Sequence, residues 1–144
     1  LHDALPILQY IDLLKDIGLK ATPQRLCILK TLAKHTHPTI DELYDEIKKD
    51  YPSISLATVY KNLGTLLDCG LVTEVLRPNL KSKFDIKEKP HIHIVCKKCG
   101  YVKDCDCETS DLKNYHKILE KNTNTKIDDL NITAFVDECQ NCKN

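Results

Sequence analysis

Four of the eight cysteines stand in two C-x2-C pairs, Cys96 with Cys99 and Cys139 with Cys142. Two thiolates separated by two residues can converge from one tight turn, and four thiolates complete a tetrahedral zinc site with no open position. We therefore predict a structural Zn²⁺ site. Disulfides, unused thiols and redox pairs are the alternatives. A thioredoxin-like pair should open a helix, whereas Gly100 leads into a predicted strand.

A second group of possible ligands combines imidazoles with carboxylates. His91 and His93 alternate along a predicted strand, so they point to the same face. Asp85 precedes them, and Asp104 lies on a strand that should return beside them. His37 is remote, in a His-Pro turn. Such a mixed set suits Fe²⁺, Mn²⁺ or Zn²⁺. A ligand from His37 would clamp the N-terminal part of the chain to the C-terminal part, so that the metal acts as a switch.

Helices are expected in the N-terminal half. Thr22-Pro23 predicts a helix start, and Thr39 with Glu42 is a capping-box signature. A further helix is expected over about 55–69. Apolar residues at helical spacing predict the buried face of the first helix: Tyr10, Leu13, Leu14 and Ile17.

The helix over 55–69 has an outer face of small, polar and basic residues. Thr58, Tyr60, Lys61 and Asn62 lie on or beside it. A helix that reads the major groove needs donors and acceptors and little bulk. A DNA-recognition helix is therefore one interpretation, and an ordinary solvated face is the other.

A β-hairpin is predicted next, with strands over 71–76 and 80–86 and a Pro-Asn turn. Helices followed by such a hairpin suggest a winged helix, whose wing would carry Arg77 towards DNA. Beyond a linker at 87–90 the pattern becomes mixed. Strands are expected over 91–95, 101–106 and 131–136, with a helix from about Ser110. Leu130, Ile132, Ala134 and Val136 should face inward in the last strand.

Composition limits the possible functions. Lys+Arg and Asp+Glu both number 21, so net charge gives no argument for a nucleic-acid partner. No apolar run approaches the roughly 20 residues of a membrane span. The cysteine pairs in a long, charged chain favour zinc in a reducing cytoplasm over secreted disulfides. Residues 1–7 resemble a translated sequencing adapter, and we expect them to be non-native.

The segments GLKATPQR, HPTIDELY, ISLATVYKNL, HIHIVCKKCG and CQNC together resemble the ferric uptake regulator (Fur) family from about Leu8 to Cys142. The resemblance is greatest to its peroxide-sensing, PerR-like branch, because Asp104 stands where iron sensors usually have Glu. It implies an α+β fold: a winged-helix DNA-binding domain at 8–86, a hinge at 87–90 and a small α/β dimerisation domain at 91–144.

The resemblance also implies residue roles. Structural zinc falls on Cys96, Cys99, Cys139 and Cys142. A regulatory Fe²⁺ or Mn²⁺ falls on His37, Asp85, His91, His93 and Asp104. DNA contacts fall on or near Lys20, Thr22, Gln24, Arg25, Thr58, Tyr60, Lys61, Asn62 and Arg77.

The implied function is that of a bacterial cytoplasmic repressor. A homodimer would bind an AT-rich pseudo-palindromic operator, and peroxide would oxidise His37 or His91 at bound Fe²⁺ and release the DNA. An iron-responsive repressor of metal uptake genes is the rival within the family. A plain zinc-ribbon interaction module is the rival outside it. No enzyme is expected, because the zinc-deaminase and H-E-x-x-H signatures are absent.

Several residues stay outside these roles. His116 is expected to be a satisfied helix residue, and Cys27 and Cys69 are expected to be core thiols. Cys105 and Cys107 are interpreted as small strand residues, with a redox or metal role as the alternative.

Overall fold

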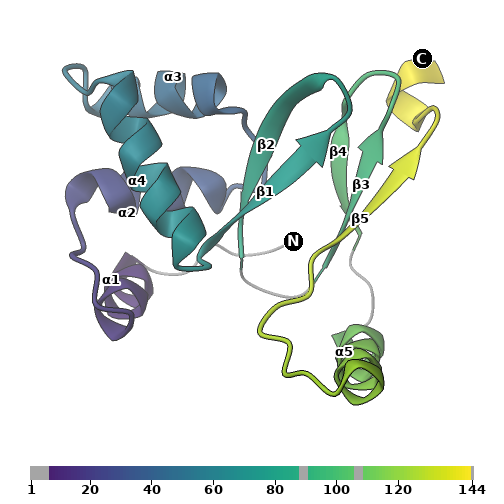
Figure 1. Cartoon of the computed structure of the whole chain (residues 1–144). Coiled ribbons are helices and arrows are strands. Elements are labelled where there is room, and N and C mark those ends of the chain that lie inside the picture. The colour runs from purple at the N-terminus through teal and green to yellow at the C-terminus, as the bar shows by residue number, and fades with distance from the viewer. Residues whose placement is uncertain (1–6, 88–90, 106–108, 144) are drawn as a thin grey trace. The chain divides into compact units, whose positions relative to one another are not determined.

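The computed structural model describes residues 7–87, 91–105 and 109–143, which divide into two compact units (Figure 1). Unit 1 holds the described residues of Leu1–Leu76 together with Lys81–Lys87. Unit 2 holds Arg77–Leu80 and the described residues of Glu88–Asn144. Residues 88–90 of the expected hinge, residues 1–6 of the adapter-like segment and Cys107 lie outside the described residues.

Unit 1 begins with four helices, and local capping explains where three of them start. Thr22 Oγ1 accepts from the Arg25 N–H at 3.3 Å, and Ser55 Oγ accepts from the Thr58 N–H at 3.1 Å. The predicted capping box of Thr39 and Glu42 is confirmed. The helices are α1 (Ile7–Asp16), α2 (Pro23–Leu32), α3 (Ile40–Asp50) and α4 (Leu56–Asp68).

Aliphatic side chains from all four helices form one core in unit 1. Its fully buried members include Leu14, Leu29, Leu43 and Leu66. The prediction for α1 was partly wrong, because Leu13 and Ile17 are 37% and 43% exposed. Among the helices of unit 1, α1 packs mainly against α2. Its buried face therefore consists of Tyr10 and Leu14.

The predicted hairpin follows α4 as β1 (Val72–Arg77) and β2 (Leu80–Ile86), which form a two-stranded sheet. Asn79 takes a positive φ of 58° in the turn, a conformation that asparagine tolerates better than most residues. Phe84 and Ile86 bury their side chains in the helical core. Four helices followed by a two-stranded wing form a winged helix, in which the end of the wing, Arg77–Leu80, groups with unit 2.

Unit 2 is a three-stranded sheet with one long helix. Its strands β3 (Ile92–Cys96), β4 (Val102–Cys105) and β5 (Ile132–Val136) run side by side in the order β4-β3-β5 (Figure 1). The β3–β4 pair is antiparallel and the β3–β5 pair is parallel. The chain passes from β3 to its parallel partner β5 through β4 and the helix α5 (Thr109–Thr123), and a parallel pair needs such a long connection.

Burial in unit 2 is sparse. Val95, Cys96 and Val102 are buried in the sheet, but no residue of β5 is. Ala134 was predicted to face inward, yet it is exposed, because β5 is an edge strand of a small, three-stranded sheet. Among the described residues of both units, no helix is long and apolar enough to cross a membrane.

Candidate metal centres

The two cysteine pairs come together at one end of the sheet in unit 2. Cys96 is the last residue of β3, and the Gly100 N–H donates to its carbonyl at 2.9 Å, which closes the first knuckle. The second knuckle leads into a short 3₁₀ helix (Gln140–Lys143) that carries Cys142. The Lys97 N–H donates to the Val136 carbonyl at 2.9 Å and so joins the two segments.

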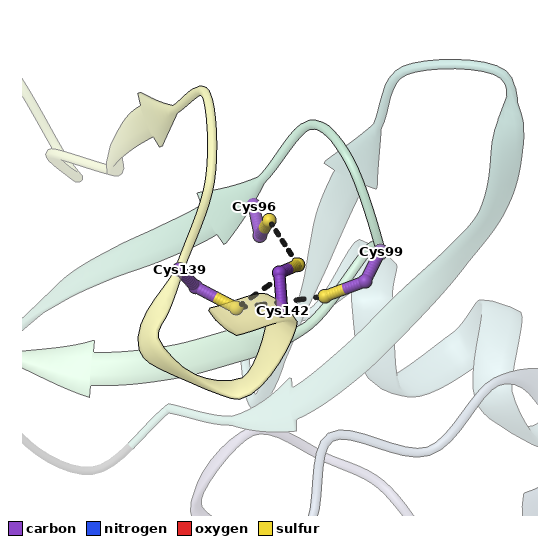
Figure 2. Close-up of side chains that lie close together, drawn as sticks. All are labelled: Cys96, Cys99, Cys139 and Cys142. Atoms are coloured by element: carbon purple, nitrogen blue, oxygen red, sulfur yellow. Dashed lines mark hydrogen bonds between the residues drawn. The ribbon is translucent and has the colours of Figure 1, made fainter. Parts of the chain in front are cut away.

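The four sulfur atoms face one another (Figure 2). The Sγ–Sγ distances are 3.5 Å for Cys96–Cys142, 3.5 Å for Cys99–Cys139 and 3.6 Å for Cys139–Cys142. Thiolates about 2.3 Å from a tetrahedral zinc are about 3.8 Å apart, whereas a disulfide needs about 2.05 Å. All four thiols are free. The donors therefore fit Zn²⁺ and do not fit disulfides.

The metal-free thiols would ionise very unequally. N–H groups of the knuckles, first that of Cys99, stabilise the Cys96 thiolate and lower the pKa of Cys96 to about 6. The neighbouring Cys99 side chain and burial raise the pKa of Cys142 to about 12. Crowded thiols cannot all carry charge without a cation, so this cluster has the electrostatics of a cation site.

Two ion pairs cross between the knuckles. Lys97 Nζ lies 2.8 Å from Asp137 Oδ1, and Lys98 Nζ lies 3.1 Å from Glu138 Oε1. Both pairs are exposed, so each contributes little free energy by itself. They nevertheless favour the closed arrangement of the two segments that carry the thiols.

Unit 2 also brings two imidazoles and one carboxylate together. His93 pairs with Asp104 across β3 and β4, and His91 precedes β3. The two imidazole Nε2 atoms are 3.0 Å apart, and each lies 3.3 Å from Asp104 Oδ1. Ligand atoms about 2.1 Å from one ion are about 3.0 Å apart at the 90° angle of octahedral coordination and about 3.4 Å apart in a tetrahedron. Two histidines and one carboxylate with this convergence are a ligand set that non-haem Fe²⁺ favours.

Unit 1 holds a second histidine–carboxylate group. Asp85, in β2, is fully buried, and its Oδ2 lies 3.5 Å from His37 Nε2. The loop before α3 is fixed beside β2 because the Phe84 N–H donates to the Pro38 carbonyl at 2.9 Å. His37 and Asp85 are 48 residues apart in the chain, and this bond accounts for their proximity. Their ligand atoms could bind one ion together.

His35 was missed by the sequence reasoning. Its Nδ1 lies 3.1 Å from Asp85 Oδ1, and its own side chain is largely buried. The only sequence signal was a second histidine two residues before His37, and that pattern alone does not identify a ligand or a ligand's partner.

The predicted DNA-contacting residues of unit 1 surround the start of α2 and the outer face of α4. Tyr60 and Lys61 are exposed on α4, Lys20 is exposed before α2, and Gln24 is half-buried. Thr22 and Thr58 both take part in helix capping. Each of these two hydroxyls therefore makes a hydrogen bond within unit 1.

Arg25 and Asn62 bond to each other. Arg25 Nε donates to Asn62 Oδ1 at 3.2 Å, and Arg25 Nη1 donates to the Lys20 carbonyl at 3.0 Å. Asn62 in turn donates to the Thr58 carbonyl at 3.1 Å. This chain of bonds ties the start of α2 to the recognition-helix candidate α4. Arg77 groups with unit 2, where Nη1 donates to the Gly100 carbonyl at 2.9 Å.

The remaining singled-out residues have local partners. His116 Nε2 donates to the Ile127 carbonyl at 2.6 Å, as expected of a satisfied helix histidine. Cys27 and Cys69 are half-buried against the core of unit 1. Cys105 is half-buried in β4.

Similarity to known proteins agrees with this arrangement. The profile of the ferric uptake regulator family matches residues 16–135. The peroxide-responsive repressor PerR of Staphylococcus saprophyticus is 44% identical over 95 residues, which are 65% of this chain and 64% of that protein. PerR of Staphylococcus aureus is 44% identical over 92 residues, 63% of this chain and 62% of that protein. The matched part is thus under two thirds of the length of these curated relatives.

Solved structures extend the similarity to most of the chain. The Campylobacter jejuni peroxide stress regulator is 52% identical, with a TM-score of 0.79 over 96% of this chain and 100% of that one. The Helicobacter pylori regulator Fur, whose structure reveals three functional metal-binding sites, shares the fold at 21% identity, with a TM-score of 0.74 over 100% of this chain and 98% of that one. The chain therefore belongs to the ferric uptake regulator family.

Proposed function

We propose that this protein is a metal-dependent transcriptional repressor of the PerR type, which releases its operator after peroxide oxidises a ligand histidine. One observation carries the proposal: His91, His93 and Asp104 converge as two imidazoles and one carboxylate. They do so in a chain that is 52% identical to a peroxide stress regulator. Such a ligand set leaves positions open to a small reactant.

The two kinds of ligand set would serve different ions. Cys96, Cys99, Cys139 and Cys142 would hold Zn²⁺, which stabilises unit 2. The two histidine–carboxylate groups would together hold one regulatory Fe²⁺ or Mn²⁺. The donors of this second site are His37, Asp85, His91, His93 and Asp104. Because they come from both units, occupancy of the site would restrict movement of one unit against the other.

A bound Fe²⁺ would supply the redox chemistry that turns hydrogen peroxide into a local oxidant, which Mn²⁺ and Zn²⁺ would not supply. The chain contributes the target: His37 or His91 would gain an oxygen atom and cease to be a ligand. Loss of one donor weakens the hold on the ion, and the two units would then separate from their DNA-binding arrangement.

DNA binding would use two copies of unit 1. Tyr60 and Lys61 are exposed on α4, where they are available for base and phosphate contacts. Phe135 and Ile118 are 49% and 52% exposed in unit 2, which supports a homodimer that covers them. An AT-rich pseudo-palindrome would match such a dimer. The bacterial cytoplasm is the place where such a repressor would act.

An iron-responsive repressor is the second candidate, because the family includes such regulators. In that case loss of Fe²⁺, without oxidation, would release the operator. Asp104 favours the peroxide sensor, since the resemblance places Glu at this position in iron sensors. The additional methylene of Glu would change the reach of the carboxylate and the open side of the site.

The test is operator binding by anaerobic protein loaded with Fe²⁺ or Mn²⁺, before and after hydrogen peroxide. We expect peroxide to abolish binding in the Fe²⁺ sample alone, with one oxygen atom added to a peptide that holds His37 or His91. Binding that survives peroxide and disappears with a chelator would identify an iron or manganese regulator. Absence of any metal-dependent binding would leave a zinc-stabilised interaction module.

A further inference from the structure

His35 lies in a strained turn next to the buried carboxylate of unit 1. His35 and His37 both have positive φ values, 55° and 51°, in the loop between α2 and α3. Non-glycine residues rarely adopt this conformation outside tight turns, although histidine, asparagine and aspartate do so more often than others. The turn directs both imidazoles at Asp85, with His35 Nδ1 at 3.1 Å from Oδ1 and His37 Nε2 at 3.5 Å from Oδ2.

The two oxygens of Asp85 have different partners. Oδ1 accepts from the Ile86 N–H at 2.9 Å and lies 3.1 Å from His35 Nδ1. A carboxylate can only accept, so Nδ1 is the donor in this contact and the imidazole must carry a proton there. Two donors on one oxygen fix the plane of the carboxylate and leave Oδ2 on the side of His37.

We propose that His35 is a positioning residue of the regulatory metal site. It holds Oδ1 of Asp85, so that Asp85 offers Oδ2 as a single-oxygen ligand to the ion that His37 binds. This inference rests on the proposed function, because it assumes that His37 and Asp85 share an ion. Outer partners that hydrogen-bond a ligating carboxylate set its orientation, and their loss typically costs about 10–100-fold in metal affinity.

Two variants of His35 distinguish the effect of its hydrogen bond to Asp85 from the effect of its positive φ. His35→Asn tolerates the positive φ and places an amide N–H close to the position of imidazole Nδ1. His35→Gly tolerates the same φ and has no donor. The measured quantities are the Mn²⁺ dissociation constant of zinc-loaded protein and the visible absorption of the Co²⁺-substituted regulatory site. Asp85→Ala serves as the control that removes the ligand itself.

We expect His35→Gly to weaken Mn²⁺ binding by about 10–100-fold and to change the Co²⁺ bands, and His35→Asn to restore most of both. The inference is overturned if His35→Gly equals the wild type while Asp85→Ala loses the ion. It is also overturned if His35→Gly removes one of the contact-shifted imidazole N–H signals that direct coordination to Co²⁺ produces in the proton NMR spectrum, since His35 would then be a ligand. A smaller, through-space shift of the His35 N–H is expected of a neighbour that only hydrogen-bonds Asp85.

Failure of the proposed function has a different signature. The wild-type protein would then bind no Mn²⁺ or Co²⁺ beyond the cysteine site, and Asp85→Ala would change nothing. If His35→Gly fails to fold, His35→Gln replaces it, because its amide corresponds to imidazole Nε2 and does not reach Oδ1 in the manner of Nδ1. Weak Mn²⁺ binding by His35→Gln with rescue by His35→Asn supports the inference, and equal binding by both overturns it.

Discussion

His93 stands directly opposite Asp104 in the antiparallel β3–β4 pair, with Nε2 3.3 Å from Oδ1. Cross-strand partners of this kind have their separation fixed by the backbone ladder rather than by flexible loops. The imidazole and the carboxylate are therefore held close together before any ion binds. This preorganisation fixes two of the donors that unit 2 contributes to the proposed regulatory site.

Asp104→Ala should weaken Mn²⁺ binding by at least about 10-fold, because it removes the one carboxylate of this set. Operator binding should then require correspondingly more Mn²⁺. Equilibrium dialysis and fluorescence anisotropy measure the two quantities. Lys103→Ala is the matched control, since Lys103 is the exposed neighbour in the same strand. An unchanged Mn²⁺ dissociation constant in Asp104→Ala would rule out Asp104 as a ligand.

Cys139→Ser should abolish stoichiometric zinc and lower the melting temperature by more than about 10 °C, because structural zinc contributes directly to folding free energy. Elemental analysis and calorimetry provide the readouts. Cys27→Ser should retain the zinc, since Cys27 lies in the other unit. Retention of a full equivalent of zinc by Cys139→Ser would contradict the four-thiolate assignment.

The sequence predicted helices and strands well where the interactions that form them join residues close together in the chain. Thr39 and Glu42 cap a helix through bonds that span three residues, so the pattern alone is sufficient. The two cysteine pairs could likewise be identified from their spacing, because each pair lies in one tight turn. Leu13 was misjudged for the opposite reason: helical spacing gives a face, but the number of neighbouring elements decides how wide a stripe is buried.

His35 shows where prediction from the sequence ended. Its contact with Asp85 spans 50 residues and depends on a positive φ at His35 and on the Phe84–Pro38 bond. None of these is encoded by a local pattern. The Arg25–Asn62 bond was missed in the same way: both residues were predicted to contact DNA, and no local pattern indicated that they contact each other.

The metal-free protein should show one thiolate forming near pH 6. The pKa of Cys96 is lowered from 9.0 to about 6, chiefly by the Cys99 N–H, so folding favours the thiolate. Its contribution to stability is therefore present at high pH and is lost as the pH falls through about 6. Cys142, with its pKa raised to about 12, contributes in the opposite sense, and that contribution is lost as the pH rises above 9.

A pH titration of protein freed of metal by a chelator should show the ionisation of Cys96 as a rise in ultraviolet thiolate absorbance. The variant Cys96→Ser should lack this rise. Zinc should remove the ionisation step near pH 6, because thiolates bound to zinc are already deprotonated at that pH. A titration with no ionisation below pH 8 would show that the Cys99 N–H does not stabilise the Cys96 thiolate in solution.

Arg25→Ala should weaken operator binding mainly because α4 loses its fixed position, and not only because a phosphate contact is lost. Arg25 holds both Asn62 and the Lys20 carbonyl, so its removal should loosen α4 against the start of α2. We expect about a 10-fold or greater loss of affinity together with a lower melting temperature, because a hydrogen bond made by a charged group typically contributes about 1.5–3 kcal/mol. Lys61→Ala should instead lower operator affinity and reduce its salt dependence by about one ion, with the melting temperature unchanged.

Fluorescence anisotropy across a salt series, together with calorimetry of each variant, distinguishes positioning by Arg25 from a phosphate contact. Lys30→Ala is the control, because Lys30 is an exposed cation on α2. If Arg25→Ala leaves the melting temperature unchanged and reduces only the salt dependence, Arg25 acts as a phosphate contact and the Arg25–Asn62 bond is not what orients α4.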